Sequence, residues 1–311
     1  MSLDRYAVIG QPIQHSRSPR IHAAFASATQ QALAYTALEV APAELAATLA
    51  RLHAEGYRGL NVTLPHKQAV AALCETVSPR AQRAGAVNTL IRTDSGWAGD
   101  NTDGLGLIRD LQRLGMAVAG QRVLILGAGG ATRGLLEPLL EQQPLSLTVA
   151  NRNPWKPEAL AESFADLGRV LPRTHLSLKG DLFDLILNAT SAGHEGRMVR
   201  LPGQLLAPGG VCYDLNYGAA HAPFARWASG QGVTRLADGL GMLVEQAAAA
   251  FELWRGVRPS TAGVLQALRA SDPSLAEPAP PVVAHPAEAA QGREEWLRLH
   301  PSVRKSPDGS H

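Results

Sequence analysis

The hydrophobic positions of the chain alternate between short continuous runs and helix-spaced sets, which predicts repeated strand and helix units. Residues 123–126 are continuously apolar, as in a parallel strand that is covered on both faces. Glycines follow at once, and Leu135, Leu136, Leu139 and Leu140 then recur at helical spacing. The predicted order at this point is therefore strand, tight turn and helix.

The same two patterns recur elsewhere and predict an alternating α/β fold. Short apolar runs between turn residues predict strands at residues 6–9, 34–40, 59–63, 86–91, 97–99, 145–150, 183–190, 210–215 and 234–236. Apolar residues at spacings of three and four predict helices that open near residues 19, 42, 68, 103, 130, 222 and 240. A chain of 311 residues is longer than one core normally supports, so we expect two domains.

The periodic pattern of apolar residues stops after residue 270. Residues 272–286 are rich in proline and offer little apolar sequence to bury, so residues 271–311 are predicted to be a flexible tail. A brief helix in residues 287–299, around Trp296, is the element expected there.

Composition and charge narrow the classes of partner. The net charge is +2 with basic and acidic residues interspersed, so no nucleic-acid partner is expected. The chain start lacks a secretory pattern and no apolar run has the length of a membrane span, which predicts a cytoplasmic protein without a membrane partner. Cys74 and Cys212 lie in apolar surroundings and are expected to be reduced thiols. The sequence leaves open whether the chain forms a homodimer.

The glycine-rich turn after residue 126 predicts an anion site. Gly127 permits the turn, and Gly129 removes the side chain that would keep a pyrophosphate from the backbone. The first N–H groups of the helix that follows have no intrahelical partner and point at such a ligand. A dinucleotide is the expected ligand, and a purely structural turn is the alternative.

The end of the next strand indicates which dinucleotide is bound. Where an NAD site carries a carboxylate for the ribose hydroxyls, this chain has Asn151 and Arg152, with Lys156 just beyond. A carboxylate would repel a 2′-phosphate, whereas a guanidinium binds it. NADP is therefore preferred over NAD, and a merely solvated Arg152 is the alternative.

Polar side chains near the ends of the N-terminal strands are candidates for substrate chemistry. Ser18 can cap the helix that follows, whereas Ser16 has no such structural role in view. Lys67 stands at a predicted helix start, where the helix dipole disfavours a cation, which is a weak hint of function. Asp103 supplies the acidic partner that Lys67 needs. For Thr102 and Asp103 a plain N-cap is the alternative, and for Lys67 a solvated charge.

Together these stretches resemble the shikimate dehydrogenase family over nearly all of residues 4–270. The matching stretches are Ser16-Arg17-Ser18-Pro19, Asn61-Val62-Thr63-Leu64-Pro65-His66-Lys67, Gly85-Ala86-Val87-Asn88-Thr89, Asn101-Thr102-Asp103-Gly104, the glycine turn, Asn151-Arg152, Asn188-Ala189-Thr190-Ser191 and Asp238-Gly239-Leu240-Gly241-Met242-Leu243. Several separated motifs in the right order are far more specific than any one of them.

The resemblance implies an α/β protein of two domains and a reaction. Residues 1–104, completed by helices in residues 240–270, would form the substrate-binding and catalytic domain, and residues 105–239 a Rossmann-like NADP-binding domain. The implied activity is the reversible, NADP-dependent reduction of 3-dehydroshikimate to shikimate in aromatic amino acid (chorismate) biosynthesis.

The resemblance also implies roles for single residues. Lys67 and Asp103 would form the catalytic pair, and no metal is implied. Substrate contacts are expected from Ser16, Ser18, Thr63, Asn88, Asp103, Tyr217 and Gln246. From its spacing alone, Gln246 fits a hydrogen-bonded buried amide equally well. Cofactor contacts are expected from Gly127, Ala128, Gly129, Gly130, Ala131, Asn151, Arg152, Lys156, Leu215 and Gly239.

Some positions depart from the family pattern, and three other functions stay open. Asn153 replaces the usual threonine, and residues 192–195 are atypical. Paralogues that act on quinate or aminoshikimate are one alternative, because a change of one hydroxyl contact can redirect such an enzyme. A non-catalytic module that senses a polyol is a second alternative, although the presence of both Lys67 and Asp103 argues against it. The related folate dehydrogenases are a third, and they would lack the serine loop.

Overall fold

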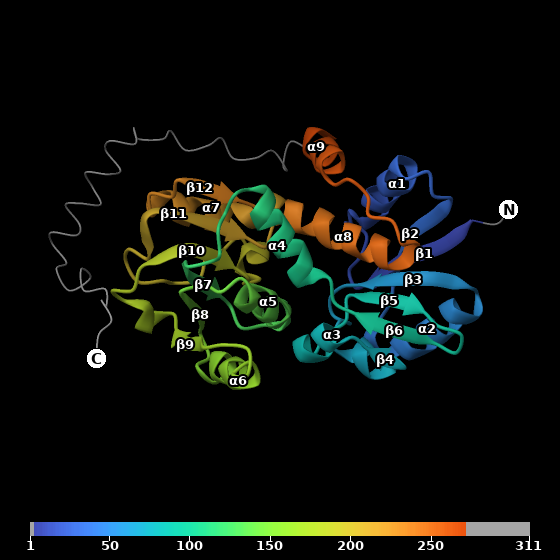
Figure 1. The fold of residues 1–311 in the computed structure, drawn as a ribbon, viewed down its shortest axis with the longest axis horizontal. Helices are drawn as coiled ribbons and strands as arrows, with labels where there is room; N and C mark the ends of the chain where they lie inside the picture. Colours follow the sequence, from blue (N-terminus) through green and yellow to red (C-terminus); the bar gives the residue numbers. More distant parts are fainter. Residues whose placement is uncertain (1–2, 272–311) are drawn as a thin grey trace, which may run out of the picture.

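The computed structural model describes residues 3–271, which form two β-sheets with helices packed around them (Figure 1). The strands are β1 (Asp4–Gly10), β2 (Leu33–Glu39), β3 (Tyr57–Val62), β4 (Thr76–Val77), β5 (Thr89–Arg92), β6 (Trp97–Asp100), β7 (Arg122–Leu126), β8 (Ser146–Asn151), β9 (Val170–Thr174), β10 (Phe183–Asn188), β11 (Leu206–Asp214) and β12 (Arg235–Ala237). The α-helices are α1 (Ser18–Ala28), α2 (Leu45–Ala54), α3 (Pro79–Ala84), α4 (Asp103–Arg113), α5 (Gly130–Glu141), α6 (Trp155–Ser163), α7 (Ala222–Gly230), α8 (Leu240–Arg255) and α9 (Ala262–Ser271). The predicted tail and its short helix lie outside the described residues.

The first sheet brings several loops to one edge. Its strand order is β2-β1-β3-β5-β6-β4, with β1, β2 and β3 parallel and β5 antiparallel to both β3 and β6. Because β5 runs the other way, its beginning lies beside the ends of β3 and β6. The residues that follow β1, β3 and β6 and those that precede β5 therefore meet at the same edge of the sheet.

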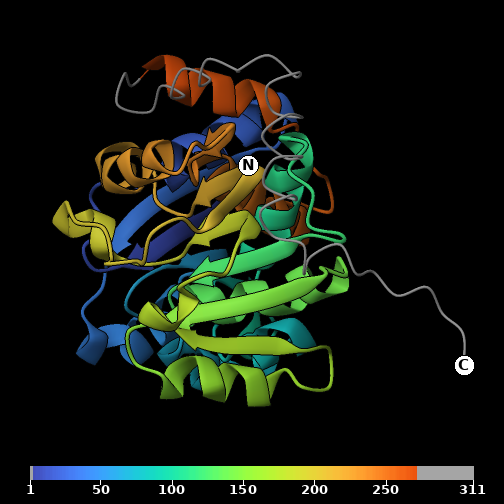
Figure 2. The same ribbon diagram turned by 90° about the vertical axis from the view of Figure 1, so that its left-hand side faces the viewer.

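The second sheet is parallel throughout, with the order β12-β11-β10-β7-β8-β9. Figure 2 turns this sheet toward the viewer and shows its strands side by side. The chain runs outward from β7 through β8 to β9, then returns to the other side of β7 with β10. The strand order thus reverses between β7 and β10, which is where open α/β sheets bind ligands at the carboxyl ends of their strands. The predicted Rossmann-like arrangement is confirmed.

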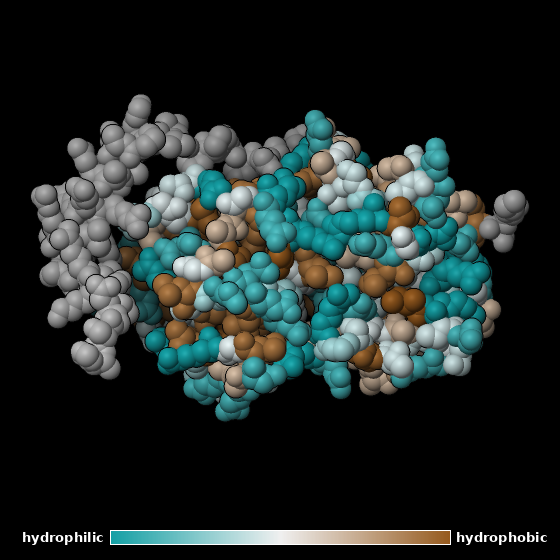
Figure 3. All heavy atoms as spheres, viewed as in Figure 1, coloured by the Kyte–Doolittle hydropathy of each residue, from teal (hydrophilic) through white to brown (hydrophobic). Residues whose placement is uncertain are grey.

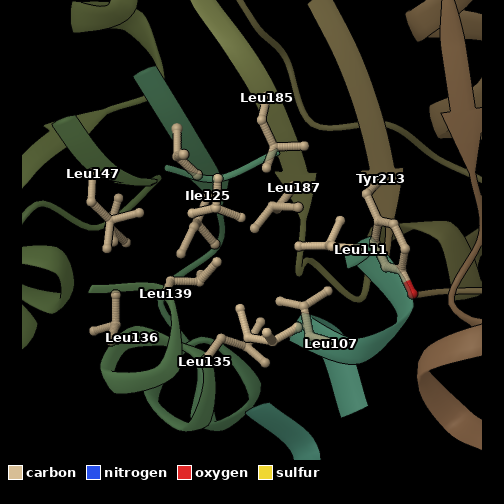
Figure 4. Close-up of a cluster of buried hydrophobic side chains, with 14 of the residues drawn as sticks. Leu107, Leu111, Ile125, Leu135, Leu136, Leu139, Leu147, Leu185, Leu187 and Tyr213 are labelled. Carbon is tan, nitrogen blue, oxygen red and sulfur yellow. The ribbon is translucent and has the colours of Figure 1, made fainter. Parts of the chain in front are cut away.

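Buried leucines join the second sheet to its helices (Figure 4). Leu107 and Leu111 of α4 and Leu135 and Leu139 of α5 pack on the strands together with Ile125 of β7. The opposite face is covered by α7, whose Phe224 and Ala228 belong to a separate buried cluster. Both faces of the sheet are therefore apolar, as the continuous hydrophobic runs predict for buried parallel strands.

Helices α4 and α8 lie side by side between the two sheets (Figure 1). Gly106 of α4 makes this approach close: a Cβ there would stand 2.8 Å from the backbone nitrogen of Gln246 and 2.8 Å from the carbonyl oxygen of Met242, both on α8. Helix α8 also packs on α1 and α9 through a shared apolar cluster that includes Phe25, Phe251 and Leu265. The two sheets are thus connected through packed helices.

Some predicted elements differ from the structure. Residues 69–73, predicted as the start of a helix, form the short 3-10 turn η2 (Ala69–Leu73), in which Val70 is buried and Leu73 is 41% exposed. One buried side chain provides too little packing to hold a longer helix. The strand predicted from residue 86 begins as β5 at Thr89. Helices α3 and α6 and strands β4 and β9 were not among the predicted elements. Helix α6 buries Pro157 and Leu160 alone, so few apolar positions mark it in the sequence.

Hydrophilic residues cover much of the face drawn in Figure 3, and hydrophobic residues show between them. Within residues 3–271 no helix has the length and apolar character to cross a bilayer. Cys212 is buried and Cys74 is partly buried, and both are free thiols, as predicted. Burial raises the pKa of the Cys74 thiol to about 11.

Candidate active site

One cavity of about 560 Å³, here called the lysine cavity, contains the side chains predicted to act on the substrate. It lies at the shared edge of the first sheet and reaches α8 and the loop after β11. Every residue predicted to bind the substrate is part of its lining, together with the predicted catalytic lysine, namely Ser16, Ser18, Thr63, Lys67, Asn88, Asp103, Tyr217 and Gln246. The chain segments that supply them are far apart in sequence, so the fold brings the predicted set together.

Lys67 and Asp103 are in direct contact in this cavity. Lys67 Nζ donates to Asp103 Oδ2 at 2.6 Å. The Lys67 side chain is 28% exposed and that of Asp103 is 11% exposed, so both reach the cavity while most of each is sheltered from solvent. A sheltered pair is oriented more firmly than a surface pair, which side-chain entropy and salt weaken.

Asn88 orients the carboxylate of this pair. Its amide nitrogen donates to Asp103 Oδ1 at 2.7 Å, and its amide oxygen accepts from the backbone N–H of Thr102 at 2.9 Å. The Asp103 N–H in turn donates to Asn101 Oδ1 at 3.0 Å, so Asn101, not Thr102, satisfies this group at the start of α4. Both oxygens of the carboxylate therefore have a donor, and the loop before α4 is fixed by side-chain amides.

Gln246 extends the network from α8. Its Oε1 lies 3.4 Å from Asn88 Nδ2 and 3.4 Å from Thr102 Oγ1, while its Nε2 donates to the Leu243 carbonyl at 2.9 Å. Its spacing in the sequence left two alternatives for Gln246, a hydrogen-bonded amide or a ligand contact. In the structure the side chain is hydrogen-bonded and also lines the cavity. The close approach of α4 and α8 at Gly106 sets these distances.

The serine loop differs from the prediction in which serine helps to start α1. The residue before α1 is Arg17, and Ser18 is already helical and buried, without a side-chain capping bond. Ser16 Oγ instead accepts from the Ser18 N–H at 3.3 Å. The prediction that Ser18 caps the helix was wrong, because a hydroxyl two residues earlier satisfies the open N–H group of the first turn. Both serines line the cavity.

The second sheet contributes the far wall of the lysine cavity. Leu215 and Tyr217 follow β11, and Gly239 follows β12. Burial raises the pKa of the Tyr217 hydroxyl above its usual value, so the phenol is neutral near pH 7. Leu215 and Gly239, predicted as cofactor contacts, lie in this cavity with the substrate residues, so loops from both sheets line it.

A second cavity of about 860 Å³, here called the glycine cavity, lies at the carboxyl ends of the strands of the second sheet. Six of the residues predicted to bind the cofactor line it, namely Gly127, Ala128, Gly129, Asn151, Arg152 and Lys156. Gly130 and Ala131 form the exposed first turn of α5 and are not part of the lining. His194 lines the lysine cavity while Ala192 and Glu195 line the glycine cavity, so residues 192–195 form a shared wall.

The glycine turn has the geometry that a close approach of a ligand needs. Gly127 has φ +102°, and a Cβ there would stand 3.0 Å from the carbonyl oxygen of Ala189 on the neighbouring loop. Nothing lies within 4 Å of where a Cβ of Gly129 would be, so the space above the turn is open. Thr132 Oγ1 donates to the Gly127 carbonyl at 2.8 Å and holds the turn against α5. The first N–H groups of α5 therefore face open space, as in a phosphate site.

Cations stand on the side of this cavity where β8 ends. Arg152 and Lys156 are exposed, and the Lys156 ammonium lies 5.5 Å from the ring centre of Trp155. Asn151 donates to the Asn153 carbonyl at 3.2 Å, which shapes the turn after β8. Within residues 3–271, no cluster of three or more His, Cys, Asp or Glu side chains has the arrangement of a metal site.

Several lining residues were not predicted from the sequence. Thr174, His175 and Leu176 line the glycine cavity because β9, which was not predicted, pairs with β8 and ends beside Asn151. Arg197 and Arg200 line it from an irregular segment without any periodic pattern. The loop of residues 189–191 was recognised as a motif, and its position directly after a buried strand could have marked it as lining.

The arrangement suits a reaction that needs both a dinucleotide and a proton donor. A charged lysine held beside a carboxylate can give a proton to a developing alkoxide and stabilise its charge. The amides and hydroxyls around it can hold a polar ligand with several hydroxyl groups. Because residues 192–195 separate the two cavities, a ligand in one lies next to a ligand in the other.

Comparisons with known proteins agree with this geometry. The family model described as the shikimate dehydrogenase substrate binding domain matches residues 8–90. That of shikimate / quinate 5-dehydrogenase matches residues 111–196, and that of the shikimate 5′-dehydrogenase C-terminal domain matches residues 239–269. The three matches follow one another in chain order and include residues of both cavities.

Individual relatives match over nearly their whole length. Shikimate dehydrogenase (NADP(+)) of Aeromonas hydrophila is 52% identical over 268 residues, which are 86% of this chain and 98% of that protein. The enzyme of the same name from Methylococcus capsulatus is 52% identical over 269 residues, 86% of this chain and 96% of that protein. A solved structure of shikimate 5-dehydrogenase from Thermus thermophilus, in complex with NADP(H) and shikimate, has a TM-score of 0.76 at 34% identity and covers 87% of this chain and 100% of that one. These matches confirm the resemblance seen in the motifs: the chain belongs to the shikimate dehydrogenase family.

Proposed function

We propose that this chain catalyses the reversible, NADP-dependent reduction of 3-dehydroshikimate to shikimate, with Lys67 and Asp103 as its catalytic pair. The reaction belongs to the biosynthesis of the aromatic amino acids. The observation that carries the proposal is the 2.6 Å contact between Lys67 Nζ and Asp103 Oδ2, in a cavity that shares a wall with the glycine cavity.

The glycine cavity fits NADP. The open space above Gly129 leaves room for a pyrophosphate at the start of α5, and Arg152 and Lys156 supply the positive charge that a 2′-phosphate needs. When bound, NADP supplies hydride-transfer chemistry. The chain supplies binding, orientation and the proton.

Lys67 is the group that handles this proton. In the reductive direction its ammonium donates a proton to the carbonyl oxygen of the substrate as that oxygen gains negative charge. Asp103 keeps the ammonium in position through Oδ2, and the Asn88 amide holds Oδ1 so that the carboxylate does not rotate. In the oxidative direction the same pair receives the proton of the hydroxyl group. The geometry thus serves both directions of one reaction.

The remaining polar residues of the lysine cavity would hold the substrate. Ser16 and Ser18 offer two hydroxyls and Tyr217 a neutral phenol, groups that can donate to a carboxylate. Thr63 and Gln246 lie in the same lining and suit ring hydroxyls. A site built to bond several hydroxyls rejects analogues that lack one of them, because the unused polar groups would stay unpaired.

We place the reaction in the cytoplasm, where free thiols such as Cys74 and Cys212 persist. The test is a panel of shikimate, quinate and aminoshikimate, each with NADP⁺ and with NAD⁺. We expect the highest kcat/KM with shikimate and NADP⁺. A higher kcat/KM with quinate or aminoshikimate would show that this compound, not shikimate, is the substrate. Tight binding of shikimate without any NADPH formation would contradict the proposed enzymatic activity.

A further inference from the structure

The segment of residues 197–200 brings two arginines to the glycine cavity. Residues 197–200 line this cavity, following Gly196, whose φ of +68° redirects the chain after the short turn of residues 192–195. Met198 and Leu201 pack against the buried cluster beneath α7. Arg197 and Arg200 of the same segment are exposed and line the cavity.

The charges in the cavity are unbalanced. Arg152 and Lys156 stand on one side and Arg197 and Arg200 on another, while the one carboxylate in the lining is that of Glu195. Glu195 forms an ion pair with Arg197. Among the described residues 3–271, Arg200 has no ion pair or hydrogen bond of its own. Among the described residues, the cavity therefore holds the free Arg200 guanidinium in addition to the Arg152 guanidinium and the Lys156 ammonium on the β8 side.

We propose that Arg200 binds the 2′-phosphate of NADP and is a second determinant of the preference for NADP over NAD. The inference rests on the proposed function, since it assumes that a dinucleotide occupies this cavity. A pyrophosphate at the turn is served by the backbone N–H groups of α5 and needs no extra cation. A 2′-phosphate carries close to two negative charges and three acceptor oxygens at neutral pH, so a guanidinium outside the β8 turn can add a bidentate contact to those of Arg152 and Lys156.

Lys179 supplies the control for the test. It is an exposed cation of the same domain that is not part of the lining of the glycine cavity. We expect Arg200→Ala to lower kcat/KM for NADP⁺ by about five- to tenfold and to leave kcat/KM for NAD⁺ unchanged. A tenfold loss corresponds to about 1.4 kcal/mol, the scale of one charge-assisted contact. Lys179→Ala should leave kcat/KM for NADP⁺ unchanged.

A binding measurement separates this inference from the activity. Calorimetric titration with 2′-AMP and with 5′-AMP measures binding without turnover. Arg200→Ala should lower the affinity for 2′-AMP and leave that for 5′-AMP unchanged. Arg200→Lys should recover part of the lost affinity for 2′-AMP. Equal losses with NADP⁺ and NAD⁺, or no loss in either assay, would overturn the proposal. If the parent protein binds 2′-AMP through Arg200 but turns over no shikimate, the proposed reaction fails and the phosphate site stands.

Discussion

Replacing Gly106 by alanine tests whether the contact between α4 and α8 sets the geometry of the lysine cavity. The added methyl would stand 2.7 Å from Gln246 Cβ, 2.8 Å from Gln246 N and 2.8 Å from the Met242 carbonyl oxygen. Ordinary contact begins near 3.4 Å, so the helices must separate by about 0.6 Å. Two of the three atoms are backbone and cannot move aside by a change of rotamer.

The size of the effect follows from these contacts. Overpacking costs about 1–3 kcal/mol, and the higher helix propensity of alanine returns up to about 1 kcal/mol. We expect a net destabilisation of about 3 kcal/mol at most. The bonds from Gln246 to Asn88 and Thr102 are already 3.4 Å long and would be lost, so kcat/KM for shikimate should fall about tenfold.

Urea unfolding midpoints and steady-state kinetics together decide this prediction. Gly263→Ala in α9 is the control, because nothing lies within 4 Å of where its Cβ would be. That variant should be as active as the parent and at least as stable. If Gly106→Ala also matched the parent in both assays, the argument that close packing at this point positions Gln246 would be refuted.

Three further outcomes follow from single side chains. Arg152→Ala should raise KM for NADP⁺ at least about tenfold and leave KM for NAD⁺ unchanged, and equal effects on both would show that Arg152 does not select the 2′-phosphate. Burial lowers the pKa of His22 to about 3, so the unfolded chain binds one more proton between about pH 3 and 6.5. The unfolding free energy should therefore fall below pH 6.5 by about 1.4 kcal/mol per pH unit from this group, and His22→Phe should remove that part of the slope in urea titrations at several pH values. With its pKa near 11, Cys74 should be about one-thousandth thiolate at pH 8, so a disulfide reagent should modify the native protein far more slowly than the protein in denaturant; equal rates would contradict its burial.

The sequence was sufficient for the parts of the fold that local chemistry dictates. The apolar run of β7 and the glycines after it specify strand, turn and helix within a short stretch, and α4, α5 and α8 follow from the spacing of their apolar residues. Helix α6 and strand β9 were not predicted, because their apolar residues follow neither the helical spacing nor a continuous run clearly. In β9, Pro172 and Arg173 interrupt the apolar run between Val170 and Thr174.

Side-chain partners were harder to predict than elements. Nothing in the spacing of Asn88 shows that its amide meets Asp103, because the contact depends on β5 running antiparallel to its neighbours. The serine that satisfies α1 was misjudged for a similar reason, since either hydroxyl is within reach of the first turn. The sequence did not mark the arginines of residues 197–200, because they lie in an irregular segment without a periodic pattern.

The pairing of Lys67 with Asp103 is the central claim, and the turnover of shikimate by Lys67→Ala tests it most directly. NADPH formation should be measured at saturating shikimate and NADP⁺, with circular dichroism to establish that the fold is retained and with the exposed Lys179→Ala as control. The account predicts that kcat falls by about 10²–10⁴-fold in Lys67→Ala and stays unchanged in Lys179→Ala. A folded Lys67→Ala protein that oxidises shikimate at the parental rate would contradict it.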